Sequence, residues 1–165
     1  DFFFQLSGFI MLYVNWKYAG HGARTWRFLI QRFTRIYPIY WCVLAVTVLA
    51  YWYCPPSLDR MWAPTDTLQP GKLYLAATLQ DTGATIVGPA WTLTYEVLFY
   101  LFFSTFFLVS PPVFVGLSLT WLGAILAQWQ GLIAWPYPVA LRLIVGHFML
   151  GMFAAALVRG MLRPW

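Results

Sequence analysis

The sequence predicts an all-α integral membrane protein, a polytopic bundle of about five transmembrane helices with one cytoplasmic amphipathic helix. Two observations predict this fold. Only 9% of the 165 residues are charged and 61% are hydrophobic, whereas a soluble domain carries about 25% charged residues. The apolar runs are also long and unbroken, which is typical of membrane helices and unlike the alternating segments of an outer-membrane barrel.

Five apolar runs are the expected spans of a single partial membrane domain covering residues 1–165. The first run is short of the ~20 residues that cross a bilayer, and the chain begins inside it without Met, so we expect a piece of a longer protein. An outer loop separates the second and third runs, and a short surface helix is expected within it at 72–79. The spans lie near residues 2–16, 39–53, 90–109, 113–128 and 139–158, and the outer loop covers 54–88.

Two cysteines are too few to form a disulfide framework, and their spacing fits no metal site. Cys42 stands inside an apolar run and is expected to be a free core thiol, while Cys54 follows that run and is expected at the membrane interface. No metal is therefore expected.

Residues 23–37 have the pattern of an amphipathic helix. At about 100° per residue, polar side chains fall on one arc and apolar side chains on the other, with Phe28 the one misplaced residue. Such a helix lies in the interface plane with its arginines toward water and phosphate, and Pro38 is expected to end or kink it. The polar arc holds Arg24, Arg27, Gln31, Arg32 and Arg35, and the apolar arc holds Trp26, Leu29, Ile30, Phe33, Ile36 and Tyr37.

The distribution of charge predicts the orientation. Lysine and arginine collect in cytoplasmic segments. With five spans, the basic stretch 17–35 and the basic tail after residue 158 fall on one side, whereas the other side holds Arg60 and Lys72 balanced by three aspartates. We expect segment 17–37 to be cytoplasmic and loop 54–88 to be extracytoplasmic, in a bacterial inner membrane.

One carboxylate stands inside an expected span. Glu96 lies about seven residues, or ~10 Å, from the outer end of its helix, and an ionised side chain inside a membrane costs roughly 2.5–3.5 kcal/mol or more. Arg142 and His147 enter the last span from the same side, so we expect the three to meet in a polar cavity. The alternative is a structural Glu96–Arg142 ion pair with His147 as a satisfied core residue, and for His147 alone the sequence favours that alternative.

The arginines before Pro38 admit two interpretations. They can orient the protein and contact anionic lipid, at about 1 kcal/mol each. Alternatively, Arg32 and Arg35 bind a phosphorylated cytosolic ligand, because guanidinium offers phosphate a bidentate pair of donors. Composition does not choose between these interpretations.

Three stretches carry a family resemblance when taken in order. Residues 1–9 read DFFFQLSGF, residues 32–38 read RFTRIYP and residues 91–101 read WTLTYEVLFYL. They are similar to the Asp-x-Phe-Phe-x-x-Ser-Gly-Phe, Arg-x-x-Arg-Ile-Tyr-Pro and Trp-Ser-Leu-x-x-Glu-x-x-Phe-Tyr-Leu patterns of the membrane-bound acyltransferase 3 family. The resemblance covers residues 1–110; the last two expected spans fit only in hydrophobic pattern.

The resemblance implies an O-acyltransferase. The donor would be a cytosolic acyl-CoA, often acetyl-CoA, and the acceptor a hydroxyl of a sugar or another cell-envelope or secondary-metabolite molecule, with membrane lipid around the protein and no nucleic acid or bound cofactor. It gives Arg32 and Arg35 the phosphates of coenzyme A as ligand and places Glu96 in the reaction cavity. We therefore expect Glu96 to be catalytic. The expected substrate-binding residues are Arg32, Arg35, Trp91 and Arg142.

The chain departs from the family pattern in three respects. Thr92 replaces the usual serine but keeps a hydroxyl, and Glu96 is a single acid where two often stand together. The family's first span, with a histidine thought to act as base, has no counterpart here, and neither His21 nor His147 sits in a matching motif. Because a hydroxyl is a poor nucleophile without a positioned base, the chain alone is expected to be inactive.

Two other function classes fit the sequence. A transporter or channel segment would use Glu96, Arg142 and His147 as a path for protons or ions, although no expected span shows the Gly/Pro-broken core typical of midplane binding sites. A catalytically inactive membrane scaffold would need none of these groups for chemistry.

Overall fold

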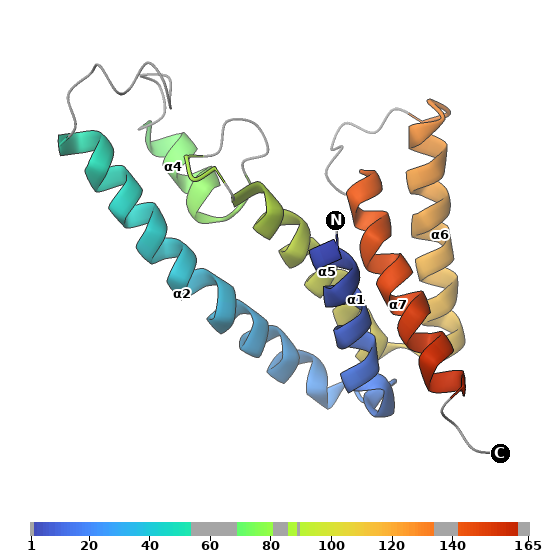
Figure 1. Cartoon of the computed structure of the whole chain (residues 1–165). Helices are drawn as coiled ribbons and strands as arrows, with labels where there is room; N and C mark the ends of the chain where they lie inside the picture. The colour runs from blue at the N-terminus through green and yellow to red at the C-terminus, as the bar shows by residue number, and fades with distance from the viewer. Residues whose placement is uncertain (1, 54–68, 81–85, 89, 134–141, 162–165) are drawn as a thin grey trace. The chain divides into compact units, whose positions relative to one another are not determined.

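The computed structural model describes residues 2–53, 69–80, 86–88, 90–133 and 142–161, and within these ranges the regular structure is helical (Figure 1). The chain is therefore an all-α protein, as predicted. The Lys72–Leu79 surface helix is confirmed with slightly different ends. The elements are α1 Phe2–Asn15, the 3₁₀ turn η1 Trp16–Tyr18, α2 Ala23–Tyr53, α4 Pro70–Ala77, α5 Ala90–Leu108, α6 Pro111–Trp129 and α7 Leu143–Met161.

Four helices in the described part of the chain are long and apolar enough to cross a membrane, by length and composition. The first expected span is α1, whose 14 residues rise only ~21 Å and fall short of a ~30 Å hydrocarbon core. The four helical segments are Ala23–Ala50, Ala90–Leu108, Pro111–Trp129 and Leu143–Gly160.

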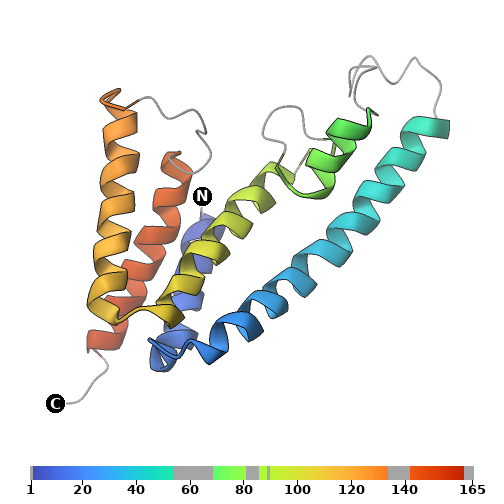
Figure 2. The same cartoon turned by 180° about the vertical axis from the view of Figure 1, so that it is seen from behind.

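The amphipathic segment 23–37 and the span 39–53 form one helix, so the expectation that Pro38 ends the amphipathic helix is wrong. Helix α2 continues for 31 residues with Pro38 in its interior, as both views of the cartoon show (Figure 1, Figure 2). Proline has no N–H to donate to the carbonyl of Thr34. Membrane helices tolerate this loss because neighbouring groups satisfy the freed carbonyl. Pro38 therefore indicates a helix end less strongly here than a proline does in a water-soluble helix.

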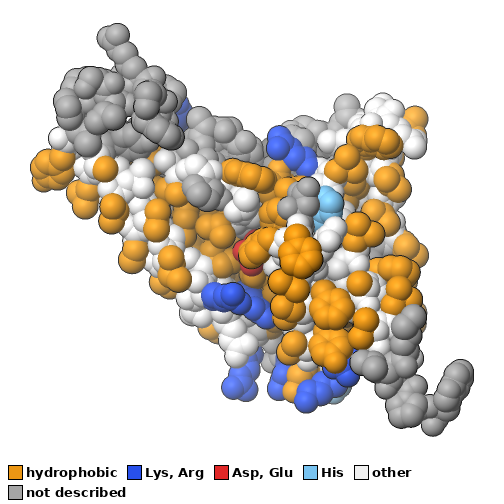
Figure 3. All heavy atoms as spheres, viewed as in Figure 1, with side chains coloured by type: hydrophobic (Ala, Val, Ile, Leu, Met, Phe, Trp, Pro, Cys, Tyr) orange, Lys and Arg blue, Asp and Glu red, His pale blue; other side chains and the backbone are white. Residues whose placement is uncertain are grey.

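Hydrophobic side chains cover much of the visible surface of the helices (Figure 3). Large apolar residues such as Ile39, Val46 and Trp52 of α2 are more than half exposed, which suits a helix surrounded by lipid. Cys42 is free, as expected, but it is exposed; the expectation of a core thiol is wrong because this part of α2 is not packed on all sides. Cys54 lies outside the described residues.

Two compact units make up the chain, residues 1–29 with 98–165 and residues 30–97. Helices α2 and α5 each contribute residues to both units. The first unit has a phenylalanine core: Phe99, Phe103 and Phe107, spaced four residues apart along α5, are fully buried. From α7, the ring of Phe148 stacks on Phe99 with 4.1 Å between centroids.

Phe28, the apparently misplaced residue, is part of this core. It is 5% exposed, whereas Trp26 of the expected apolar arc is 72% exposed. The Phe28 ring lies 5.5 Å from Phe103 and 5.2 Å from Phe107. Lipid is as apolar as a neighbouring helix, so shape complementarity and not hydrophobicity decides which apolar face is packed.

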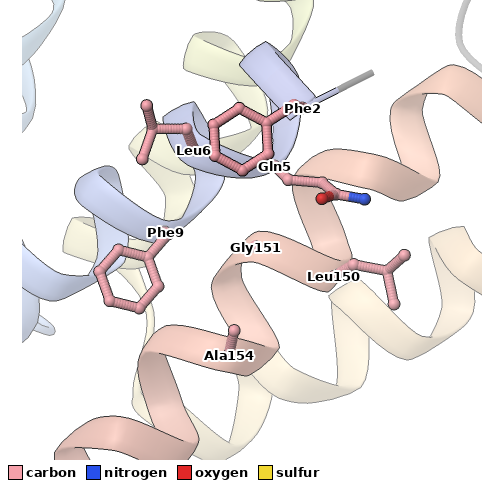
Figure 4. Close-up of a pocket in the computed structure, with 7 residues that line it drawn as sticks. All are labelled: Phe2, Gln5, Leu6, Phe9, Leu150, Gly151 and Ala154. Atoms are coloured by element: carbon pink, nitrogen blue, oxygen red, sulfur yellow. The ribbon is translucent and has the colours of Figure 1, made fainter.

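Helices α1 and α7 approach each other closely through two glycines. A Cβ placed on Gly8 would meet the carbonyl oxygen of Phe148, and one placed on Gly151 would meet the carbonyl oxygen of Gln5. Small residues allow such backbone contact between membrane helices. Beside the contact lies a pocket of about 310 Å³ (Figure 4), lined by Phe2, Gln5, Leu6, Phe9, Leu150, Gly151 and Ala154.

Candidate functional site

The second unit, residues 30–97, is organised around the C-terminal end of α4. The Tyr40 hydroxyl of α2 donates a hydrogen bond to the Ala76 carbonyl at 2.7 Å, and the Trp41 indole N–H donates to the Ala77 carbonyl at 3.0 Å. Carbonyls in the last turn of a helix lack intrahelical partners; the Ala76 carbonyl also accepts the backbone N–H of Leu79 at 3.0 Å. The bond from Trp41 thus gives the Ala77 carbonyl a partner, and the bond from Tyr40 gives the Ala76 carbonyl a second one.

Helix α5 joins the same point through one threonine. The Thr94 hydroxyl donates to the Leu79 carbonyl at 3.0 Å. Leu79 ends the α4 turn in the left-handed region with φ 57°, a conformation usually left to glycine, and its side chain is 5% exposed. The α4 end therefore holds α2 and the first turns of α5 in one structure.

These hydrogen bonds set the relative levels of the predicted site residues. Within this unit α2 and α5 run in opposite directions (Figure 1, Figure 2). Glu96 lies two residues beyond Thr94, or ~3 Å along the axis, and Arg35 lies five residues before Tyr40, or ~7.5 Å. Glu96 and Arg35 therefore differ by roughly one helical turn in level. The sequence placed Arg35 in a cytoplasmic segment and Glu96 near the outer end of its helix, which would separate them across the membrane. That separation assumed that the segment before Pro38 is a helix of its own, whereas α2 is continuous.

Glu96 is buried, with 8% of its surface exposed, and it is the one acidic residue among those the structure describes. A buried carboxylate is costly unless polar groups surround it. Trp91, about one and a half turns earlier on α5, is 45% exposed, and its ring packs edge-on against Tyr95 with 6.1 Å between centroids. The third motif thus presents a buried acid and an accessible indole on the same helix.

The two arginines of the second motif are placed differently. Arg35 is exposed and Arg32 is half-buried, both on α2. They belong to the same unit as Glu96 and Trp91, so four of the five predicted site residues lie in one compact unit. The remaining one, Arg142, does not.

Arg142 and His147 belong to the first unit. Arg142 is exposed directly before α7, and its carbonyl accepts the N–H of Val145 at 3.0 Å. The His147 ring nitrogen Nδ1 is 3.1 Å from the Gln5 amide nitrogen, which donates because an amide N–H cannot accept. His147 therefore has a hydrogen-bond partner on α1, as a satisfied residue would, but it is half-buried and does not belong to the core. Glu96 lies in the other unit, and a shared cavity of the three stays a prediction.

Sequence reasoning did not identify Tyr40, Trp41 and Thr94 as residues that position the site. Their partners are backbone carbonyls at the end of α4, and no side-chain pattern marks such carbonyls. The aromatic pair two residues after Pro38 was the available signal. Among the described residues, no group of three or more His, Cys, Asp and Glu side chains is placed to hold a metal ion.

The comparisons with known proteins give one similar curated protein. "Protein 2 in picA locus" from Rhizobium radiobacter is 35% identical to this chain over 114 residues, and the match covers 59% of this chain and 59% of that protein. Its name refers to a genetic locus and states no activity. No family model matches the chain, and no solved structure matches it.

Proposed function

We propose that this chain is part of a membrane O-acyltransferase that moves an acyl group, often acetyl, from acyl-CoA to a hydroxyl of a sugar or another cell-envelope or secondary-metabolite acceptor. The observation that carries the proposal is the grouping in one unit of a buried acid, Glu96, with an exposed arginine, Arg35, at nearly the same level of antiparallel helices. Two of the three motifs that resemble the acyltransferase 3 family supply these residues.

Acyl transfer from acyl-CoA to a hydroxyl needs both an acidic group and cationic groups. The acceptor oxygen attacks the thioester carbonyl carbon, the carbon–sulfur bond breaks, and the thiol of coenzyme A leaves with the proton that the hydroxyl gives up. Arg32 and Arg35 bind the donor's phosphates by charge-assisted hydrogen bonds. Glu96 accepts a hydrogen bond from the acceptor hydroxyl or from the group that deprotonates it, and Trp91 provides an accessible aromatic face for a sugar.

The proposal includes an orientation. The basic end, with segment 17–37, faces the cytoplasm of a bacterial inner membrane, where acyl-CoA is made, and the loop 54–88 faces outward. The excess of lysine and arginine in the expected cytoplasmic segments supports this orientation.

The test uses membranes that carry the full-length protein and labelled acetyl-CoA. Glu96→Gln keeps the shape and removes the charge, and we expect its kcat to fall by about 10²–10⁴, the range of general acid–base contributions. Arg35→Gln is expected to raise KM for acetyl-CoA about 10–150-fold with a smaller change in kcat, because one hydrogen bond to a charged group contributes ~1.5–3 kcal/mol.

Arg27→Gln is the matched control, since Arg27 is also an exposed arginine of α2 but lies outside the second unit. It should retain the wild-type kcat and KM. Full activity of both Glu96→Gln and Arg35→Gln would refute the site. Movement of a solute without a covalent product would instead identify a transporter.

A further inference from the structure

A second cavity lies entirely within the first unit and has no role in the proposed reaction. Its volume is about 710 Å³. Its lining comes from η1 and the residue after it, from α5, from α6 and from α7, and includes Lys17, Phe106, Pro111, Phe114, Val115 and Arg159.

The cavity stands at the level of the membrane interface because helix ends form its walls. Lys17 lies in η1, which directly follows α1, Phe106 is in the last turn of α5, Pro111 begins α6 and Arg159 is in the last turn of α7. Four ends of apolar helices at one level mark the boundary between hydrocarbon and headgroups, where phospholipid phosphates lie.

Two cations face this cavity. The guanidinium of Arg159 donates from Nη2 to the Tyr13 carbonyl at 2.7 Å and lies 4.4 Å from the Tyr13 ring. These contacts hold the side chain in place, yet its Nε is buried and has no hydrogen-bond partner. The Lys17 ammonium lies 5.0 Å from the Tyr18 ring. No acidic side chain is described in this unit, so nothing described here neutralises either charge.

The remaining walls are apolar. Phe106 and Phe114 are buried at 3% and 5% exposure and lie 5.1 Å apart, and Val115 is 54% exposed. A site with cations at the interface and an aromatic, aliphatic floor fits an amphiphile that carries an anionic head. A small anion such as inorganic phosphate would use the cations and leave the apolar walls without a ligand.

We propose that this cavity binds one anionic phospholipid, with its phosphate on Lys17 and Arg159 and its glycerol and upper acyl chain against Phe106, Phe114 and Val115. Basic pockets between membrane helices bind lipid headgroups in this way. Acyl-CoA shares the phosphate chemistry, but the level of the cavity and its apolar walls favour a lipid. The proposal does not depend on the acyltransferase activity.

The test measures lipid bound to the full-length protein in nanodiscs or mixed micelles by native mass spectrometry, with phosphatidylglycerol against phosphatidylcholine as probes. We expect one phosphatidylglycerol retained in preference to phosphatidylcholine. Lys17→Gln should weaken its retention about fivefold, the factor for ~1 kcal/mol per basic residue, and Arg27→Gln should leave retention unchanged.

Arg159→Gln also removes the contact with Tyr13 and can affect folding, so Val115→Trp is the second variant. It fills the cavity without changing charge and should reduce phosphatidylglycerol retention as Lys17→Gln does. Equal retention of the two lipids, equal losses in Lys17→Gln and Arg27→Gln, or full retention in Val115→Trp would each overturn the proposal. Displacement of the lipid by coenzyme A or inorganic phosphate at equal concentration would overturn it in favour of a general phosphate site.

Discussion

Substitution of Gly8 by alanine should separate α1 from α7. The added methyl group would clash with the Phe148 carbonyl oxygen, and because that oxygen belongs to the backbone, no side chain can move aside. Overpacking of this kind costs about 1–3 kcal/mol, and stretching of the Gln5–His147 hydrogen bond adds ~0.6 kcal/mol. Alanine recovers up to ~1 kcal/mol of helix propensity, which leaves a net loss of ~1–3 kcal/mol.

That loss corresponds to a fall in Tm of roughly 2–12 °C at 2–4 °C per kcal/mol. The assay is thermal unfolding of the full-length protein in detergent, followed by fluorescence-detected size-exclusion chromatography. Gly146→Ala is the matched control on α7, since a Cβ at Gly146 meets nothing within 4 Å. Its Tm should stay the same or rise slightly.

Gly151→Ala should behave like Gly8→Ala, because a Cβ at Gly151 would meet the Gln5 carbonyl oxygen. The double variant should lose less than the sum, since either methyl group alone already separates the two helices. A Tm for Gly8→Ala equal to that of Gly146→Ala would show that α1 and α7 are not packed backbone to backbone.

Three further predictions follow from named contacts. Phe103→Ala should destabilise the protein by about 3–5 kcal/mol, because Phe103 is fully buried; an unchanged midpoint of chemical unfolding would contradict this. Tyr40→Phe should cost ~0.6–1.7 kcal/mol by leaving the Ala76 carbonyl without this bond, measured as faster hydrogen exchange in α4; unchanged exchange would count against the cap. The hydrogen bond from Lys17, together with nearby positive charge, lowers the pKa of the Tyr18 phenol. A lowered pKa means that the folded protein favours the phenolate more than the unfolded chain does. Any stabilisation therefore appears only at alkaline pH, where the phenol ionises, and is absent at pH 7. Absorbance titration should show Tyr18 ionising earlier in wild type than in Lys17→Gln; identical curves would refute the assignment.

The order of elements could be predicted from sequence, but the contacts inside them could not. The expected spans at 90–109 and 113–128 match α5 and α6 closely, and the end of the first run matches that of α1. The expectation that Pro38 ends the helix failed because neighbouring groups in a membrane can satisfy the carbonyl that an interior proline leaves without its N–H partner. Phe28 did not fit the amphipathic pattern of residues 23–37 and was counted as misplaced. In the structure it packs against the phenylalanines of α5.

The site was predicted in part. Glu96, Trp91, Arg32 and Arg35 were identified by their residue types and motifs, and the structure places these four in one unit. The hydrogen bonds of Tyr40 and Thr94 to the end of α4 were not predictable, because backbone carbonyls carry no sequence signal. They bring Glu96 and Arg35 to similar levels along the two helices. Counting residues from each membrane face had placed these two residues far apart.

The sequence by itself determined that this chain enters a membrane as helices, because so few charges cannot cover a water-soluble surface and lipid requires every backbone group to be paired within the chain. It also determined where most of those helices lie. The tertiary structure decided which faces pack: Phe28 and not Trp26, Gly8 against Phe148, and the end of α4 against Tyr40. Hydrophobicity cannot make that choice where lipid and protein are equally apolar, so it falls to shape and to hydrogen bonds.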